Sequence, residues 1–165
     1  RRYTREAYLG KVEKLRAAVP GIGLTTDLIV SFPGETESQF EDTCSLVREV
    51  GYDAAFTFIF SPRAGTKAAA MADDTPMEEK TRRIQRLIDL QQSLTQQALE
   101  SQVGSRQQVL VEAVSTRDEG CVCGKTQRGH MVNFPGDEAL TGKFVDVKIT
   151  SAGKNTLRGT IIEGG

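Results

Sequence analysis

Hydrophobic residues recur at two different spacings along this chain. Over residues 4–18 the apolar positions follow a helical period that stops at Pro20-Gly21, and residues 37–50 repeat that period up to Gly51. Two short apolar runs, at residues 24–32 and 54–60, are typical of strands. Helix, strand, helix and strand with short connections predict consecutive β/α units on a parallel sheet.

The first of these strands is the clearest signal. Leu28-Ile29-Val30 is continuously apolar, so we expect a strand covered on both faces, ended by Pro33-Gly34 and followed by a helix from Thr36. Two strands do not form a stable parallel sheet alone. The sequence therefore predicts a piece of a larger β/α barrel, whose exposed strand edges favour self-association.

A third helix is predicted from Pro76, because Glu78 and Glu79 follow it in the position of a first helical turn. An apolar stripe continues to about Gln102 on a segment otherwise rich in Arg and Gln. This pattern indicates a helix that packs along one side and connects two domains.

Beyond Gly104 the pattern changes to short β-rich runs separated by Gly, Asn and Asp. Val145, Val147 and Ile149 alternate with polar residues, as in a half-buried strand. Five such runs fit a small closed OB-like barrel, at residues 108–115, 120–126, 130–134, 143–150 and 156–163. The predicted fold class is α/β plus all-β, with domains at 1–75, 76–103 and 104–165.

Composition narrows the function only a little. The 165 residues have a formal net charge of −1, so an RNA-binding role needs a local basic patch rather than bulk charge. No apolar run approaches the roughly 20 residues that cross a bilayer, and no leader pattern opens the chain. We therefore expect a cytoplasmic protein without a membrane partner.

The cysteines do not predict a disulfide or metal site. Cys44, Cys121 and Cys123 are an odd number, which argues against a disulfide framework. A C-x-C pair can ligate metal, but such sites take about four soft ligands and the sequence adds only the single His130. We expect structural roles for these residues.

The first candidate site lies where the two predicted strands end, the functional rim of β/α barrels. The residues after the first strand are Ser31, Pro33, Gly34 and Glu35. Arg63 follows the second strand, and its guanidinium suits a carboxylate or a phosphate. Two alternatives remain: Glu35 complements a helix dipole, and Arg63 pairs with Asp73 or Asp74.

The second candidate site lies in the predicted barrel. Its members are basic, amide or aromatic residues on adjacent runs: Lys125, Arg128, His130, Asn133 and Phe134. Such a cluster on an OB-like barrel can follow a phosphate backbone and stack on an unpaired base. Alternatively, Phe134 belongs to the barrel core.

Several motifs together resemble the tRNA methylthiotransferase type of radical S-adenosylmethionine (SAM) enzymes. They are Thr26-Asp27, Phe32-Pro33-Gly34-Glu35-Thr36, Phe60-Ser61-Pro62-Arg63, Gly65-Thr66, Gly124-Lys125-Thr126, Val132-Asn133-Phe134 and Leu157-Arg158-Gly159. The resemblance covers nearly the whole chain. Ser31 stands where that family usually has Gly, and Lys125 where Arg is more usual.

This resemblance implies a function. The first part would correspond to the closing strands of a radical SAM barrel, and the last to a TRAM domain, an OB-like RNA binder. The parent enzyme would add a methylthio group to carbon 2 of an N6-isopentenylated adenosine beside the anticodon of a tRNA, with SAM and 4Fe-4S clusters as cofactors. Ser31, Pro33, Gly34, Glu35 and Arg63 would line a SAM or substrate pocket.

The cluster motif C-x3-C-x2-C is absent from the sequence. By the resemblance, the cluster domain and the first part of the barrel are therefore missing partners, and this chain alone is expected to hold no cofactor and to be inactive. Two other functions stay open: a freestanding RNA-binding module, and a methylthiotransferase for a ribosomal protein or a different modified adenosine.

Overall fold

Two compact units make up the chain. A computed structural model describes residues 3–162. One unit comprises residues 1–14 and 24–94, and the other comprises residues 15–23 and 95–165. Each unit is built around its own cluster of buried apolar side chains.

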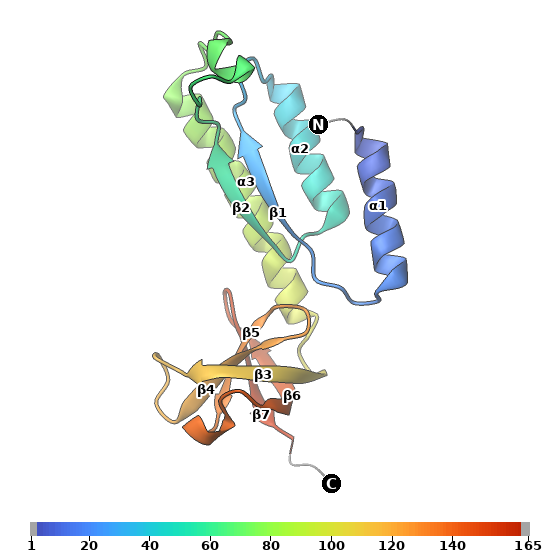
Figure 1. The fold of residues 1–165 in the computed structure, drawn as a ribbon, viewed down its shortest axis with the longest axis vertical. Coiled ribbons are helices and arrows are strands. Elements are labelled where there is room, and N and C mark those ends of the chain that lie inside the picture. Colours follow the sequence, from blue (N-terminus) through green and yellow to red (C-terminus); the bar gives the residue numbers. More distant parts are fainter. Residues whose placement is uncertain (1–2, 163–165) are drawn as a thin grey trace. The chain divides into compact units, whose positions relative to one another are not determined.

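The first unit contains two parallel strands, one whole α-helix and parts of two others (Figure 1). The elements in chain order are α1 (Arg5–Ala18), β1 (Thr25–Val30), α2 (Glu37–Val50), β2 (Ala54–Ile59), the 3-10 helix η1 (Lys67–Ala70) and α3 (Met77–Glu100). The whole of α2 lies in this unit, while α1 and α3 belong to it up to residues 14 and 94 and to the second unit beyond. β1 pairs with β2 in parallel, from Thr25 opposite Ala54 to Val30 opposite Ile59. The predicted β/α units are therefore present.

Both ends of α2 are set by the residues that predicted them. The Thr36 hydroxyl accepts a hydrogen bond from the Gln39 backbone N–H, and the Gln39 side chain accepts one from the Thr36 N–H. This capping box satisfies two N–H groups that the helix cannot bond itself. At the other end Gly51 adopts a positive φ of 59°, and its N–H donates to the Val47 carbonyl at 2.9 Å.

Helix α3 confirms the helix predicted after Pro76. Glu78 and Glu79 lie in its first turn, where their charge complements the helix dipole. The helix has 24 residues, yet many of them are charged or amide side chains. Among residues 3–162, no helix has both the length and the hydropathy that a membrane crossing requires.

The core of the first unit lies on one side of its sheet. Leu28 and Val30 are buried there against Phe40 of α2 and Leu87 of α3. The prediction that β1 is covered on both faces is wrong, because Ile29 is 57% exposed. Burial alternates along the strand because the helices pack against one face, and nothing in the described part of the chain covers the other.

The second unit contains a closed barrel, which confirms that part of the predicted fold. Its strands are β3 (Arg106–Val114), β4 (Cys121–Thr126), β5 (Met131–Pro135), β6 (Phe144–Ala152) and β7 (Leu157–Ile161), with the 3-10 helix η2 (Glu138–Leu140) before β6. The order around the barrel is β3-β4-β5-β7-β6, and only the β5–β7 pair is parallel. Glu163, the predicted end of the last strand, lies outside the described residues.

Two glycines allow the barrel strands to approach closely. A Cβ atom on Gly124 would lie 2.1 Å from the Leu110 carbonyl oxygen, and one on Gly159 would lie 2.4 Å from the Val147 side chain. Neither distance is sterically allowed. Both glycines belong to the motifs Gly124-Lys125-Thr126 and Leu157-Arg158-Gly159, so these motifs have a packing reason independent of any ligand.

Candidate functional site

The segment after β1 forms a closed loop. The Glu35 N–H donates to the Phe32 carbonyl at 2.8 Å, and Gly34 adopts a positive φ of 79° inside this turn. The Glu35 carboxylate accepts a hydrogen bond from the Ser31 backbone N–H at 3.0 Å. Glu35 therefore ties the two ends of its own loop together, and its side chain faces the loop rather than solvent.

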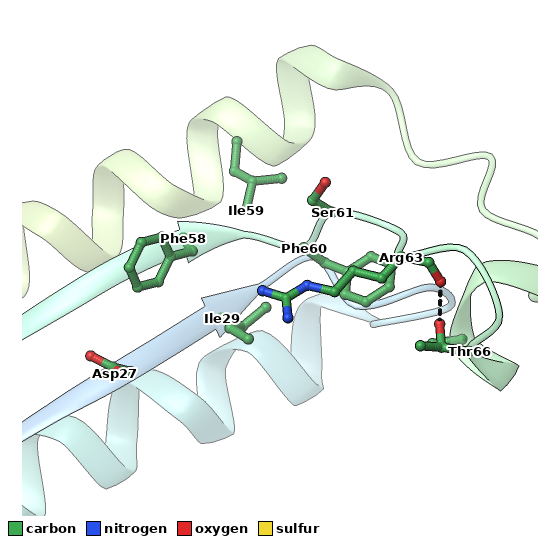
Figure 2. Close-up of a pocket in the computed structure, with 9 residues that line it drawn as sticks. Asp27, Ile29, Phe58, Ile59, Phe60, Ser61, Arg63 and Thr66 are labelled. Carbon is green, nitrogen blue, oxygen red and sulfur yellow. Dashed lines mark hydrogen bonds between the residues drawn. The ribbon is translucent and has the colours of Figure 1, made fainter.

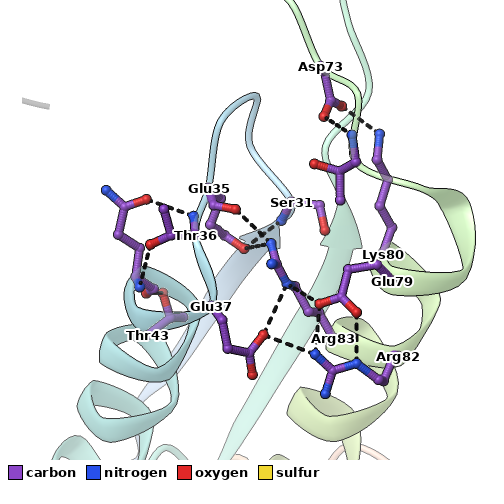
Figure 3. A network of polar contacts seen from close by, with 12 residues as sticks. Ser31, Glu35, Thr36, Glu37, Thr43, Asp73, Glu79, Lys80, Arg82 and Arg83 are labelled. Carbon is purple, nitrogen blue, oxygen red and sulfur yellow. Dashed lines mark hydrogen bonds and ion pairs between the residues drawn. The ribbon is translucent and has the colours of Figure 1, made fainter.

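Arg83 of α3 holds this loop from the other side (Figure 3). Its Nη1 donates to the Glu35 carbonyl at 2.9 Å and lies 3.4 Å from the Glu35 carboxylate, while Nε donates to Glu79 at 2.9 Å. The guanidinium also lies 5.9 Å from the centre of the Phe40 ring. The Arg83 side chain is only 7% exposed, so its charge depends on these partners.

Further ion pairs extend this network between α2 and α3. Arg82 and Arg86 both reach Glu37, and Arg86 also reaches Glu41. The hydrogen bond from Arg82 is the largest cause that lowers the pKa of Glu79 to about 2. Glu79 is therefore ionised at neutral pH, where it pairs with Arg82 and Arg83 beside the rim of β1.

A pocket of about 620 Å³ opens on the uncovered face of the sheet (Figure 2). Its walls come from β1, β2, the following loop and η1: Asp27, Ile29, Phe58, Ile59, Phe60, Ser61, Arg63, Thr66 and Ala68. The Arg63 side chain extends from the loop after β2 back toward Ile29, as Figure 2 shows. Its backbone carbonyl accepts a hydrogen bond from the Thr66 hydroxyl at 2.8 Å, which steadies the loop.

The predicted first-site residues do not all share this pocket. Pro33, Gly34 and Glu35 line a separate hollow of about 470 Å³ beside α2. Ser31 is only 1% exposed and lines neither hollow. Of the predicted set, Arg63 alone lines the pocket on the sheet face.

The alternative partner for Arg63 is also clarified. Asp73 forms its ion pair with Lys80 rather than with Arg63.

Sequence reasoning missed Asp27 and Phe58 as pocket residues. The signal was present, because a charged residue two positions before Ile29 indicates an alternating strand with one exposed face.

The cysteines lie apart from this pocket. Cys44 is buried on α2, and burial raises the pKa of its thiol. Cys121 and Cys123 are partly exposed on β4. Within residues 3–162, no three His, Cys, Asp or Glu side chains come together as metal ligands, so the residues described here do not fit an iron–sulfur cluster.

On the barrel, the second predicted site is only partly exposed. Lys125 and Asn133 point outward on β4 and β5, and Lys125 lies 3.5 Å from Glu112. His130 and Phe134 are 8% and 1% exposed, and Phe134 belongs to the barrel core. A base-stacking role for Phe134 is therefore wrong for this structure, since neighbouring strand residues point to opposite faces and Asn133 occupies the outer one.

Sequence reasoning missed two outward residues of the barrel. Arg158 lies opposite Asn133 in the β5–β7 pair and forms an ion pair with Asp118 at 3.0 Å. Phe144 begins β6 and is 65% exposed. The alternation of Val145, Val147 and Ile149 already placed Phe144 on the opposite, outer face.

Comparisons with known proteins give these surfaces a context. Residues 100–162 match the TRAM domain family. The second unit contains a TRAM domain. Its five strands all lie within the matched residues.

Relatives match the whole chain, not the TRAM domain alone. The tRNA-2-methylthio-N(6)-dimethylallyladenosine synthases of Carboxydothermus hydrogenoformans and Moorella thermoacetica are each 48% identical, over 98% and 99% of this chain. That of Anoxybacillus flavithermus is 47% identical over 99% of this chain. The similarity confirms the predicted resemblance. The chain spans about a third of the length of these relatives, 37%, 37% and 31% respectively.

Proposed function

We propose that this chain is part of a tRNA methylthiotransferase that adds a methylthio group to carbon 2 of an N6-isopentenylated adenosine beside the anticodon. Similarity to synthases of that name along 98–99% of the chain supports this. The structural observation that carries it is the open sheet face, where Ile29, Phe56 and Phe58 are each more than half exposed.

The open face suits the inner wall of a β/α barrel. β1 and β2 are parallel neighbours, and further parallel strands on either side would curl this face inward. Three large apolar side chains left in water are costly unless another surface covers them. We therefore assign the first unit to a radical SAM barrel whose remaining strands come from outside residues 3–162.

The pocket on this face fits SAM by size and chemistry. Its volume of about 620 Å³ is in the range of small-ligand sites, which hold about 300–1,000 Å³. Arg63 would bind the carboxylate of the methionine part through parallel N–H groups. Asp27 would accept a hydrogen bond from the ammonium or a ribose hydroxyl, while Phe58 and Ile29 would contact the adenine.

The cofactor's chemistry defines what this chain must supply. When bound, SAM would supply the methyl group and, after one-electron reduction by a 4Fe-4S cluster, the radical that removes the hydrogen at carbon 2. The residues described here would bind and orient it and keep water from the apolar wall. We assign the iron–sulfur ligands to a part of the parent enzyme outside the segment that matches this chain, because residues 3–162 gather no ligand set.

The TRAM domain would hold the tRNA. Lys125 and Arg128 on and after β4 would contact phosphates, and Asn133 would contact a sugar or a base edge. Glu35 would act indirectly by keeping the Ser31–Glu35 loop closed at the pocket rim. A cytoplasmic location follows from this substrate.

A chimera tests the proposal. The third of the Moorella thermoacetica synthase that matches this chain would be replaced by this chain and expressed in cells that lack the enzyme. We expect the methylthiolated nucleoside to appear in digested tRNA, measured by mass spectrometry. A folded chimera with its clusters loaded but no modified nucleoside would contradict the proposal.

A matched pair of variants locates the pocket. Arg63→Ala in the chimera should reduce modification strongly and raise the KM for SAM. Arg48→Ala is the control, because Arg48 is a surface residue of α2 paired with Glu41 and lines neither hollow. Equal activity of both variants would remove Arg63 from the site.

A further inference from the structure

Four outward-facing residues of the TRAM barrel lie directly opposite one another on four neighbouring strands. Phe144 of β6 lies opposite Leu110 of β3, Leu110 lies opposite Lys125 of β4, and Lys125 lies opposite Met131 of β5. Residues directly opposite in an antiparallel pair have Cβ atoms about 5 Å apart. We call these four residues the outer row.

The apolar end of the outer row is open to solvent. Phe144 is 65% exposed and Leu110 is 36% exposed. The exposed ring adds little to the packing of the barrel, because Val109, Val111 and Val147 already fill the core on the inner face. The ring of Phe144 therefore presents a surface that a ligand can cover.

Cations flank this apolar end. Lys125 follows Phe144 and Leu110 in the outer row. Lys143 directly precedes Phe144 in the sequence and is exposed. Lys125 lies 3.5 Å from Glu112, and the nearest outward residue on β6, Asp146, is engaged by Arg106 at 2.7 Å. These two carboxylates are thus each matched by a cation, and Lys143 adds a further positive charge.

We propose that the outer row is the platform on which an unpaired RNA base stacks, with Phe144 under the base and Lys125 and Lys143 on its phosphates. A barrel exterior that combines an exposed ring with cations binds single strands by stacking and charge. Duplex RNA offers no free base face. This inference rests on the proposed function, since it names the part of the tRNA that the TRAM domain holds.

The row also predicts a competition at Lys125. Its ammonium contacts the Glu112 carboxylate at 3.5 Å, so a phosphate must displace that partner. Glu112→Gln should free the lysine and tighten binding. This expectation is specific to the geometry of β3 and β4, because a purely diffuse electrostatic attraction would not depend on which carboxylate is neutralised.

Binding of a fluorescent RNA tests the proposal. The probe is a single-stranded oligonucleotide with 2-aminopurine at one position, compared with the same strand in a duplex. Phe144→Ala should weaken single-strand binding about tenfold, the effect of losing one stacked base, and reduce quenching of 2-aminopurine. Lys125→Ala should weaken both probes and lower the salt slope by about one.

Matched variants separate stacking from general damage. Phe144→Tyr keeps the ring and should bind within about twofold of the parent, whereas Phe144→Leu keeps an apolar side chain and should bind like Phe144→Ala. Thermal unfolding checks that each variant is folded, as expected for a side chain that is 65% exposed.

Three results would overturn the inference. If Phe144→Ala binds RNA like the parent, the outer row is not the platform, even where the chimera still methylthiolates tRNA. If Phe144→Ala changes the oligomeric state in light scattering and leaves RNA affinity unchanged, the ring contacts a second copy of this chain. If the chain binds no RNA at all, the RNA-binding part of the proposed function fails together with this inference.

Discussion

The two units differ in whether the edges of their strands are paired. The barrel pairs each of its five strands with two neighbours, so it leaves no open edge. In the described part of the first unit, β1 and β2 each have one neighbour, and one face of the pair is exposed. The barrel thus closes its own strand edges, while the described β/α unit leaves strand edges and one sheet face open.

Replacing one phenylalanine by alanine in each unit should give the largest difference between the units. Phe134→Ala removes a fully buried ring from the barrel core, so the free energy of unfolding should fall by about 3–5 kcal/mol. Phe58→Ala, on the open sheet face, should change it by less than about 0.5 kcal/mol. Urea unfolding measures the size, and peptide-resolved hydrogen exchange shows which unit loosens.

Light scattering provides a second measurement for the exposed residue of this pair, Phe58. Phe58→Ala should also reduce any self-association of the chain in light scattering, because Phe58 is 51% exposed on the face that lacks a cover. Equal destabilisation by the two variants would show that the sheet face is covered in solution, and the contrast between the units would then be lost.

Alkaline pH should weaken the first unit alone. All three tyrosines lie outside the barrel, and burial, then the hydrogen bond with Tyr8, raises the pKa of Tyr52 above its usual value near 10. Above pH 10 an unfolded chain ionises Tyr52 while the folded unit keeps it neutral, so stability falls as pH rises. Hydrogen exchange against pH should show faster exchange around β1 and α2.

The substitution Tyr52→Phe is the matched test of that pH effect. It removes the titrating hydroxyl and keeps the ring, so the alkaline loss should shrink to the part due to Cys44, whose thiol pKa burial also raises, although the bond to Tyr8 is also lost. Persistence of the same alkaline loss in Tyr52→Phe would assign the effect to another group.

A smaller effect is expected at the β1 rim. Ser31 has a positive φ of 59°, which costs a residue with a Cβ about 1 kcal/mol. Its buried hydroxyl also has no hydrogen-bond partner among the described residues. Ser31→Gly should therefore stabilise the first unit by about 1 kcal/mol in urea unfolding.

Ser31→Ala sharpens this measurement. It removes the unpartnered hydroxyl and keeps the Cβ, so it separates the cost of the buried oxygen from the backbone cost. If Ser31→Gly is less stable than the parent, the left-handed backbone conformation at position 31 is not strained. Relief of strain would then not explain why the family that the chain resembles usually has Gly at this position.

The element boundaries could be read from the sequence because they depend on neighbouring residues. Thr36 and Gln39 form the capping box of α2, Gly51 ends that helix, and the alternation of Val145, Val147 and Ile149 set the inner face of β6. The same alternation places Phe144 on the outer face, although the sequence analysis did not single it out. The resemblance of the motifs supplied the family, and the similarity of the relatives along the whole chain agrees with it.

Other features depend on contacts between residues far apart in the chain. Whether a strand such as Leu28-Ile29-Val30 is covered on one face or two depends on which elements pack against it, and here the face with Ile29 has no cover. Glu35 closes its loop with the help of Arg83, 48 positions later, and Phe144 meets Lys125 through β3. Local sequence fixes period and turns, because those follow from backbone sterics; long-range pairing follows from packing and closure, which no local pattern contains.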